Sequence, residues 1–128
     1  MPEMKLFFDG GCRPNPGPIE VAVVVGGRAY HRQGIDTGTN DDAEWLALLY
    51  ALEVAHGLAA AEVLLVGDSA LVVNQASGVS KCRSPNLLPH LAAFRAQLDK
   101  FRRVRVRHVR RSHNLAGIAL EAARHAVR

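Results

Sequence analysis

Three acidic residues stand at positions where an acid is rarely needed for packing. Asp9 follows the largely apolar segment 4–8, Asp68 follows the apolar segment 63–67, and Glu44 is the only charged residue between 43 and 52. Carboxylate oxygens without neighbouring His or Cys ligands favour Mg²⁺ or Mn²⁺ over zinc. Divalent ions held by carboxylates commonly serve reactions at phosphate. The three acids therefore predict a metal site that acts on phosphate.

Each acid also has an ordinary explanation. Asp9 and Gly10 could form a turn, Asp68 could cap the helix that follows it, and Glu44 could complete a capping box with Asp41. These explanations weaken when the acids are considered together. Three clustered carboxylates repel one another and raise one another's pKa, and a divalent ion removes that cost. We therefore predict that the three acids share a metal centre.

The elements that must position these acids follow from hydrophobic periodicity and turn residues. Strands are expected at 4–9, 19–25, 28–33, 62–67 and 104–109, and helices at 41–56, 69–76, 89–101 and 114–127. The order βββαβααβα predicts an α/β fold in which an antiparallel meander joins a mixed five-stranded sheet with helices on both faces. If the first and fourth strands are parallel neighbours, Asp9 and Asp68 emerge at one sheet edge, within reach of Glu44.

Composition and charge set the broader class. The 128 residues predict one domain, 1–128, and the longest apolar stretches are too short to cross a bilayer. Without a secretory leader pattern, a cytoplasmic protein that does not associate with membranes is expected. The net charge is +4, and arginines concentrate between 102 and 111. This stripe favours a polyanion such as nucleic acid, although basic residues also protect sheet edges. Cys12 and Cys82 are expected to be free thiols.

Five sequence blocks resemble type 1 ribonuclease H (RNase HI), in the short form of archaea and some bacteria. The blocks are FFDGGCRPNPGP (7–18), TNDDAEWLALLYALE (39–53), VGDSALVVNQASG (66–78), KCRSPNLLP (81–89) and HVRRSHNLAGIALEAA (108–123). The resemblance covers nearly the whole chain and implies the RNase H-like fold. It further implies a monomer that cleaves the RNA strand of an RNA/DNA hybrid, with two Mg²⁺ or Mn²⁺ ions, leaving 3′-hydroxyl and 5′-phosphate ends.

The resemblance also implies roles for the acids and exposes one departure. Asp9 would bridge both metals, while Glu44 and Asp68 would hold one metal beside the RNA. The family carries a fourth acid in the pattern Asn-x-x-Ala-Asp-x-Leu, and here Ile118 occupies that position. We expect Ile118 to extend the apolar stripe of the last helix. Asn114 lies one helical turn earlier and could present its amide oxygen to the metal, although an ordinary helix cap is the alternative.

Two basic residues before the last helix are further catalytic candidates. Arg111 matches an arginine of the short members of the family and would assist at the phosphate. His113 lies where the family places a mobile residue that assists product release, and it could shuttle a proton near pH 7. An exposed loop histidine is the alternative for His113.

The same resemblance implies a surface that reads the hybrid. Gly11, Cys12, Asn15 and Asn40 would contact RNA 2′-hydroxyl groups, and Thr39 would help to hold a DNA phosphate. Asn74 and Gln75 are expected to be solvent-facing residues of the 69–76 helix.

Three functions are compatible with these residues. The first is an active, metal-dependent ribonuclease H that needs more metal than usual, or prefers Mn²⁺, because the fourth acid is missing. The second is a module that binds RNA/DNA hybrid or structured RNA without cutting it. The third is a related nuclease that acts on DNA. The three intact acids favour the first function, because a site that no longer binds metal would gain nothing from three carboxylates that repel one another.

Overall fold

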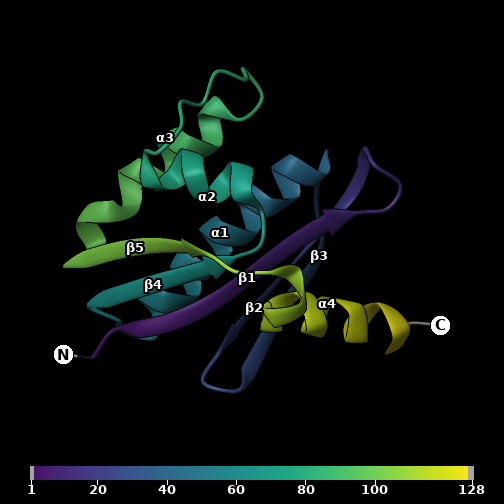
Figure 1. Cartoon of the computed structure of the whole chain (residues 1–128). Coiled ribbons are helices and arrows are strands. Elements are labelled where there is room, and N and C mark those ends of the chain that lie inside the picture. The colour runs from purple at the N-terminus through teal and green to yellow at the C-terminus, as the bar shows by residue number, and fades with distance from the viewer. Residues whose placement is uncertain (1, 127–128) are drawn as a thin grey trace.

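Strand β1 is the centre of a five-stranded mixed sheet (Figure 1). The computed structural model describes residues 2–126. Its strands are β1 (Met4–Cys12), β2 (Gly17–Val25), β3 (Arg28–Gly38), β4 (Glu62–Gly67) and β5 (Arg103–His108), in the order β3-β2-β1-β4-β5. Pairing is antiparallel from β1 to β3 and parallel from β1 through β4 to β5. The predicted antiparallel meander is confirmed, and β1 and β4 are parallel neighbours, which is the condition for Asp9 and Asp68 to emerge at one sheet edge.

Helices cover the two faces of the sheet unequally (Figure 1). The main helices are α1 (Asn40–Gly57), α2 (Ala70–Ser77), α3 (Leu88–Gln97) and α4 (Leu115–Ala126), with short 3₁₀ turns η1 (Leu98–Lys100) and η2 (Arg111–His113). Helices α1, α2 and α3 share the larger core with the sheet, whereas α4 packs alone on the opposite face. The order βββαβααβα is therefore confirmed. None of the helices in the described part of the chain is long and apolar enough to span a membrane.

The alternation of side chains along β1 decides which face carries the chemistry. Leu6 and Phe8 are fully buried in the core beneath α1. Phe7 packs with the α4 cluster, and Asp9 points to the same side because successive strand residues face opposite ways. Asp9 pairs in register with Ala22 of β2, which is itself packed under α4. The first acid therefore emerges at the border between the sheet and α4.

A glycine allows α1 to approach β1 closely. A β-carbon at Gly10 would overlap the backbone carbonyl of Ala43 in the first turns of α1. Without that side chain, the helix backbone lies against the strand, and the backbone N–H of Gly10 donates to the Glu44 carboxylate at 2.9 Å. The close packing of these two elements thus brings the second acid to the sheet.

Two strands run further than their local turn residues predicted. β1 was expected to end at Asp9, but it continues to Cys12, because Gly10 to Cys12 pair with Val21 to Ile19 of β2. β3 was expected to end at Gln33 and continues to Gly38, which pairs with Gly17. In both cases the ladder of backbone hydrogen bonds overrides the preference of glycine-rich segments for turns. The third predicted helix is also divided, into α3 and η1.

A buried hydrogen bond joins α1 to α2. The indole of Trp45, which is fully buried, donates to the side-chain oxygen of Gln75 at 3.0 Å. Gln75 is only 5% exposed, so the expectation that it faces solvent is wrong. The ring of His90 stacks on Trp45 at 6.5 Å between centroids, and Phe94 meets it edge-on. This cluster fixes the start of α1 against its neighbouring helices.

Candidate active site

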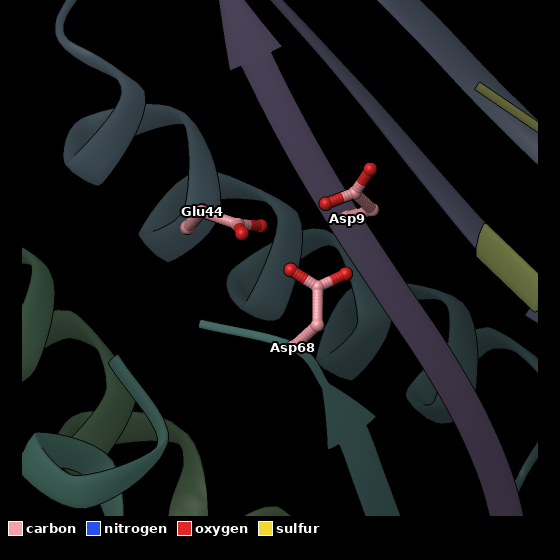
Figure 2. A group of neighbouring side chains, drawn as sticks. All are labelled: Asp9, Glu44 and Asp68. Carbon is pink, nitrogen blue, oxygen red and sulfur yellow. The ribbon is translucent and has the colours of Figure 1, made fainter. Parts of the chain in front are cut away.

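The three acids predicted from the sequence converge on one point (Figure 2). Asp9 projects from β1, Glu44 from α1 and Asp68 from the end of β4, and each offers a carboxylate oxygen within 4.8 Å of the others. Parallel pairing of β1 and β4 brings the first and third acids to neighbouring strands. The close packing of α1 on Gly10 brings the second acid to them. The group is an all-carboxylate oxygen donor set of the kind that suits Mg²⁺ or Mn²⁺.

The ordinary explanations for these acids do not hold. Asp9 lies inside a strand and not in a turn. The N-cap of α2 is Ser69, whose hydroxyl accepts from the backbone of Val72, so Asp68 does not cap that helix. The capping box of α1 is formed by Thr39 and Asp42, and Glu44 takes no part in it. The structure therefore leaves all three carboxylates free of local capping duties.

Burial and mutual repulsion hold protons on this cluster. Burial, followed by repulsion from Asp9 and Asp68, raises the pKa of Glu44 to about 9. Burial and the charge of Asp68 raise the pKa of Asp9 to about 6, against the lowering effects of a hydrogen bond from Glu44 and the charge of Arg111. The raised pKa favours the protonated form of Glu44 at neutral pH in the metal-free protein. A divalent cation would replace that proton, so the donor set fits a metal ion.

Asn114 positions Asp68 instead of offering its oxygen to a metal. The side chain is fully buried, and its amide nitrogen donates to Asp68 at 2.8 Å and to the Phe8 carbonyl at 2.9 Å. Its amide oxygen accepts from the backbone of Ala116 at 3.1 Å, in the first turn of α4. Of the two roles that the sequence allows for this oxygen, metal ligand or helix cap, the structure has the helix cap. This orientation is favoured because two acceptors surround the nitrogen and a backbone donor meets the oxygen.

Ile118 does not extend a buried stripe. Its side chain is 56% exposed, whereas Ala116 and Leu120 supply the buried face of α4. The expectation of a packed Ile118 is therefore wrong, because the helix turns this position away from β2. Beside it, Gly117 lies against the metal cluster: a β-carbon there would be 3.4 Å from the Asp9 carboxylate. The position of the family's fourth acid thus borders Asp9 but carries an apolar side chain.

The two basic candidates lie in η2 with different surroundings. Arg111 lines both cavities that flank Asp9, one of about 380 Å³ and one of about 390 Å³. Its positive charge also lowers the pKa of Asp9. His113 lies two residues later in the same turn and is exposed. The structure therefore joins Arg111 to the acidic cluster and leaves His113 at the surface of the turn.

The predicted hybrid-reading residues form a hydrogen-bonded surface beside the acids. The side-chain oxygen of Asn40 accepts from the backbone of Cys12 at 3.1 Å, and that of Asn15 accepts from the backbone of Asn40 at 3.1 Å. The Cys12 thiol lies 3.3 Å from the carbonyl of Gly38, and both cysteines are free thiols, as expected. Gly11, Cys12 and Asn40 line the 380 Å³ cavity together with Asp9 and Glu44. Thr39 is held by its capping box at the edge of this surface.

Two charged residues of α4 border the site although nothing in the sequence singles them out. Arg124 lies over Gly11 and is paired with Glu20 of β2, and it lines both cavities beside Asp9. Glu121 lines the 390 Å³ cavity with Asp9 and pairs with Arg124 at 3.2 Å. An acid and an arginine near the end of a helix are unremarkable in a sequence. They reach the site only because α4 packs across β1 and β2.

Comparisons with known proteins agree with this architecture. A family described as "Reverse transcriptase-like" matches residues 8–126. The ribonuclease HI of Halobacterium salinarum is 36% identical over 122 residues, which are 91% of this chain and 61% of that protein. A bifunctional protein of Mycobacterium tuberculosis is 37% identical over 133 residues, covering 94% of this chain and 36% of its own length. The chain thus spans about a third of the mycobacterial relatives that it matches.

Solved structures give the same result. The RNase H1 of Halobacterium salinarum aligns with a TM-score of 0.85 at 33% identity, covering 93% of this chain and 94% of that one. LC11-RNase H1, solved in complex with an RNA/DNA hybrid, aligns with a TM-score of 0.85 at 29% identity, covering 98% of this chain and 100% of that one. With its carboxylate triad on the matching sheet, the chain belongs to the type 1 ribonuclease H family.

Proposed function

We propose that this chain is an endoribonuclease that cuts the RNA strand of RNA/DNA hybrids, acting as a monomer with Mg²⁺ or Mn²⁺. The products would carry 3′-hydroxyl and 5′-phosphate ends. The observation that carries the proposal is the position of the carboxylate triad, two of whose members, Asp9 and Glu44, share a cavity with Gly11, Cys12 and Asn40. Membership of the family, and the hybrid bound to LC11-RNase H1, support the choice of substrate.

The acids and their supports have separate tasks in this proposal. Asp9, Glu44 and Asp68 would hold two ions, which when bound supply Lewis-acid activation of water and neutralise charge at the phosphate. The backbone of Gly10 orients Glu44, and the amide of Asn114 orients Asp68. Both supports are hydrogen bonds from groups in rigid elements, so the carboxylates are held in place before substrate arrives.

The remaining residues would bind and orient the hybrid. Asn40 and Cys12, tied together by a backbone hydrogen bond, would contact RNA 2′-hydroxyl groups, together with Gly11 and Asn15. Thr39 would contact a DNA phosphate at the start of α1. We assign to Arg111 a contact with the scissile phosphate, since it borders both cavities beside Asp9. His113, exposed in the same turn, would exchange a proton with solvent.

One observation favours a second function. Ile118 replaces an acid next to Asp9, so the site has fewer carboxylates than its family pattern, and a module that only binds hybrid or structured RNA is the alternative. Charge counting favours catalysis. Three carboxylates and one phosphate carry about −4 charges, which balances two divalent ions once substrate is bound.

Cleavage of a labelled RNA/DNA hybrid across Mg²⁺ and Mn²⁺ concentrations tests the proposal, with single-stranded RNA and duplex DNA as controls. We expect cleavage of the RNA strand of the hybrid alone, lost in Asp9→Asn and retained in the matched variant Asp99→Asn, whose acid is exposed in η1. Tight binding of hybrid without cleavage at any metal concentration would establish the binding module instead. Cleavage of duplex DNA would point to the third function.

A further inference from the structure

The cavity on the α4 side of Asp9 contains an acid that no family pattern identifies. This cavity of about 390 Å³ is lined by Asp9, Arg111, Gly117, Ile118, Glu121 and Arg124. Ile118, at the position of the missing fourth acid, borders the cavity with a side chain that cannot bind a metal. Glu121 borders the same cavity one helical turn later and is 54% exposed. An available carboxylate therefore shares a cavity with Asp9, the member of the acidic cluster nearest to α4.

Helix geometry places this carboxylate within reach of the missing position. Glu121 follows Ile118 by three residues, so the two lie on one face of α4, about 4.5 Å apart along the axis. Side chains on a helix tilt toward its N-terminus, and Glu is one methylene longer than Asp. Both effects let the Glu121 carboxylate reach back toward position 118 once it leaves Arg124 and His125, its partners in the structure. The helix backbone lies close to Asp9 at Gly117, where a β-carbon would be 3.4 Å from the Asp9 carboxylate.

The present partners of Glu121 can release it at little cost. It pairs with Arg124 at 3.2 Å and with His125 at 3.5 Å, and exposed pairs of this kind contribute little stability. Arg124 would keep its more buried partner, Glu20, after the release. Asn114 has no such freedom, because both ends of its amide are engaged in buried hydrogen bonds. Glu121 is therefore the better source of a replacement ligand.

We propose that Glu121 supplies the fourth carboxylate of the metal centre, from one helical turn beyond the position that Ile118 occupies. The inference rests on the proposed function, since it concerns the same ions. With Glu121, four carboxylates carry about −4 charges and balance two divalent ions before substrate arrives. The ligand set is thus completed by a shifted residue of the same helix.

Counting bound Mn²⁺ by electron paramagnetic resonance, in protein without substrate, tests the inference. We expect Glu121→Gln to weaken the more weakly bound Mn²⁺ by roughly tenfold or more. Glu53→Gln is the matched control, because Glu53 is another exposed helix glutamate in an ion pair, with Arg32 of β3. That control should bind Mn²⁺ like the unaltered protein.

A second pair of variants separates ligand loss from a general effect on the helix. Ile118→Asp should tighten Mn²⁺ binding and should make a further Glu121→Gln change nearly silent, since the acid at 118 then takes its place. The inference would be overturned if Glu121→Gln left the number and affinity of bound Mn²⁺ unchanged. It would also be overturned if Glu121→Gln reduced Mn²⁺ affinity equally in the unaltered protein and in Ile118→Asp.

The two proposals can fail separately. If the protein cleaves hybrid but its Mn²⁺ affinity does not depend on Glu121, only this inference is overturned. Mn²⁺ binding that depends on Glu121, without hybrid cleavage, would overturn the proposed function alone.

Discussion

Glu44 carries the largest electrostatic cost in the site. Its carboxyl is packed between α1 and β1, beside two other acids, and its pKa is raised to about 9. An acid whose pKa is higher in the folded protein than in the unfolded chain favours folding when protonated. Glu44 therefore lowers the free energy of unfolding as pH rises above 4.5, the pKa of its carboxyl in the unfolded chain. The cation site is thus created at the expense of stability in metal-free protein.

Removing this charge should stabilise the metal-free protein. Glu44→Gln keeps an acceptor for the Gly10 N–H and cannot ionise, so we expect a free energy of unfolding higher by roughly 1 to 3 kcal/mol at pH 8 and little changed at pH 4.5. Urea unfolding in the presence of a chelator measures it. Glu53→Gln, at an exposed site, should show no such pH-dependent gain. An equal gain at both pH values would contradict the assigned cause.

Metal binding should release protons. Because Glu44 is protonated at neutral pH and Asp9 titrates near 6, binding of a divalent ion at pH 7 should displace about one proton. Apparent affinity should therefore rise with pH, by up to about tenfold per unit between pH 6 and 9. Calorimetry in buffers of different ionisation enthalpy counts the protons. Binding heats that are the same in all buffers would contradict the raised pKa values.

At the scale of elements, the contact between β1 and α1 decides whether the second acid reaches the site. The helix backbone lies directly on Gly10, and the same glycine donates to Glu44. On the opposite face, Asn114 fixes the start of α4 to β1 and to the residue after β4. The site is therefore a junction of four elements held by two polar contacts, the hydrogen bond from Gly10 to Glu44 and the pair of hydrogen bonds from Asn114.

A methyl group at the first of these contacts should disrupt it. Gly10→Ala forces α1 away from β1, and we expect a loss of roughly 1 to 3 kcal/mol in stability and a loss of metal affinity, because Glu44 moves with the helix. Gly57→Ala is the matched control, since a β-carbon there meets nothing within 4 Å. Thermal unfolding and Mn²⁺ titration measure both effects. Wild-type metal affinity in Gly10→Ala would show that α1 positions Glu44 by other contacts.

The sequence predicts well those elements whose positions depend on hydrophobic periodicity and on the rules that govern connections. β4 runs from Glu62 to Gly67 as expected, and it pairs in parallel with β1, as a shared site for Asp9 and Asp68 requires. Strand ends were less predictable. Gly10 to Cys12 read as a turn locally, and only pairing with β2 makes them a strand.

Side-chain orientation was the other limit of prediction. Asn114 and Ile118 were correctly recognised as the unusual positions, but the direction of each depends on how α4 sits against β2. Sequence spacing shows which residues share one face of a helix, but it does not show which element that face packs against. For the same reason, Gln75 was placed in solvent, whereas the indole of Trp45 makes it a buried acceptor. Glu121 and Arg124 join the site through tertiary packing alone.

At the scale of the whole molecule, positive charge gathers on an edge of the sheet. Val104 and Val106 of β5 pack against the core, while Arg103, Arg105 and Arg107 alternate with them and are exposed. Arg105 is paired with Glu3 at 2.6 Å. β5 is an edge strand, so the arginines suit both protection from aggregation and attraction of a polyanion.

Salt dependence separates these two roles. If the arginines contact phosphates, the double variant Arg103→Gln/Arg107→Gln should weaken hybrid binding at low salt and reduce the slope of log K against log salt by roughly 1 to 2. Arg28→Gln, on the β3 edge, should leave the slope unchanged. Unaltered binding together with increased aggregation of the double variant would assign the stripe to edge protection.

The buried Trp45 has a practical consequence. It is the only tryptophan in the chain, it directly follows Glu44, and its indole N–H is fixed by a buried hydrogen bond to Gln75. Its fluorescence therefore arises from one place, where a change of charge on the neighbouring carboxylate alters the local electric field. Metal titration, proton loss and unfolding can each be followed by emission from the unlabelled protein, which thus contains its own optical probe of the site.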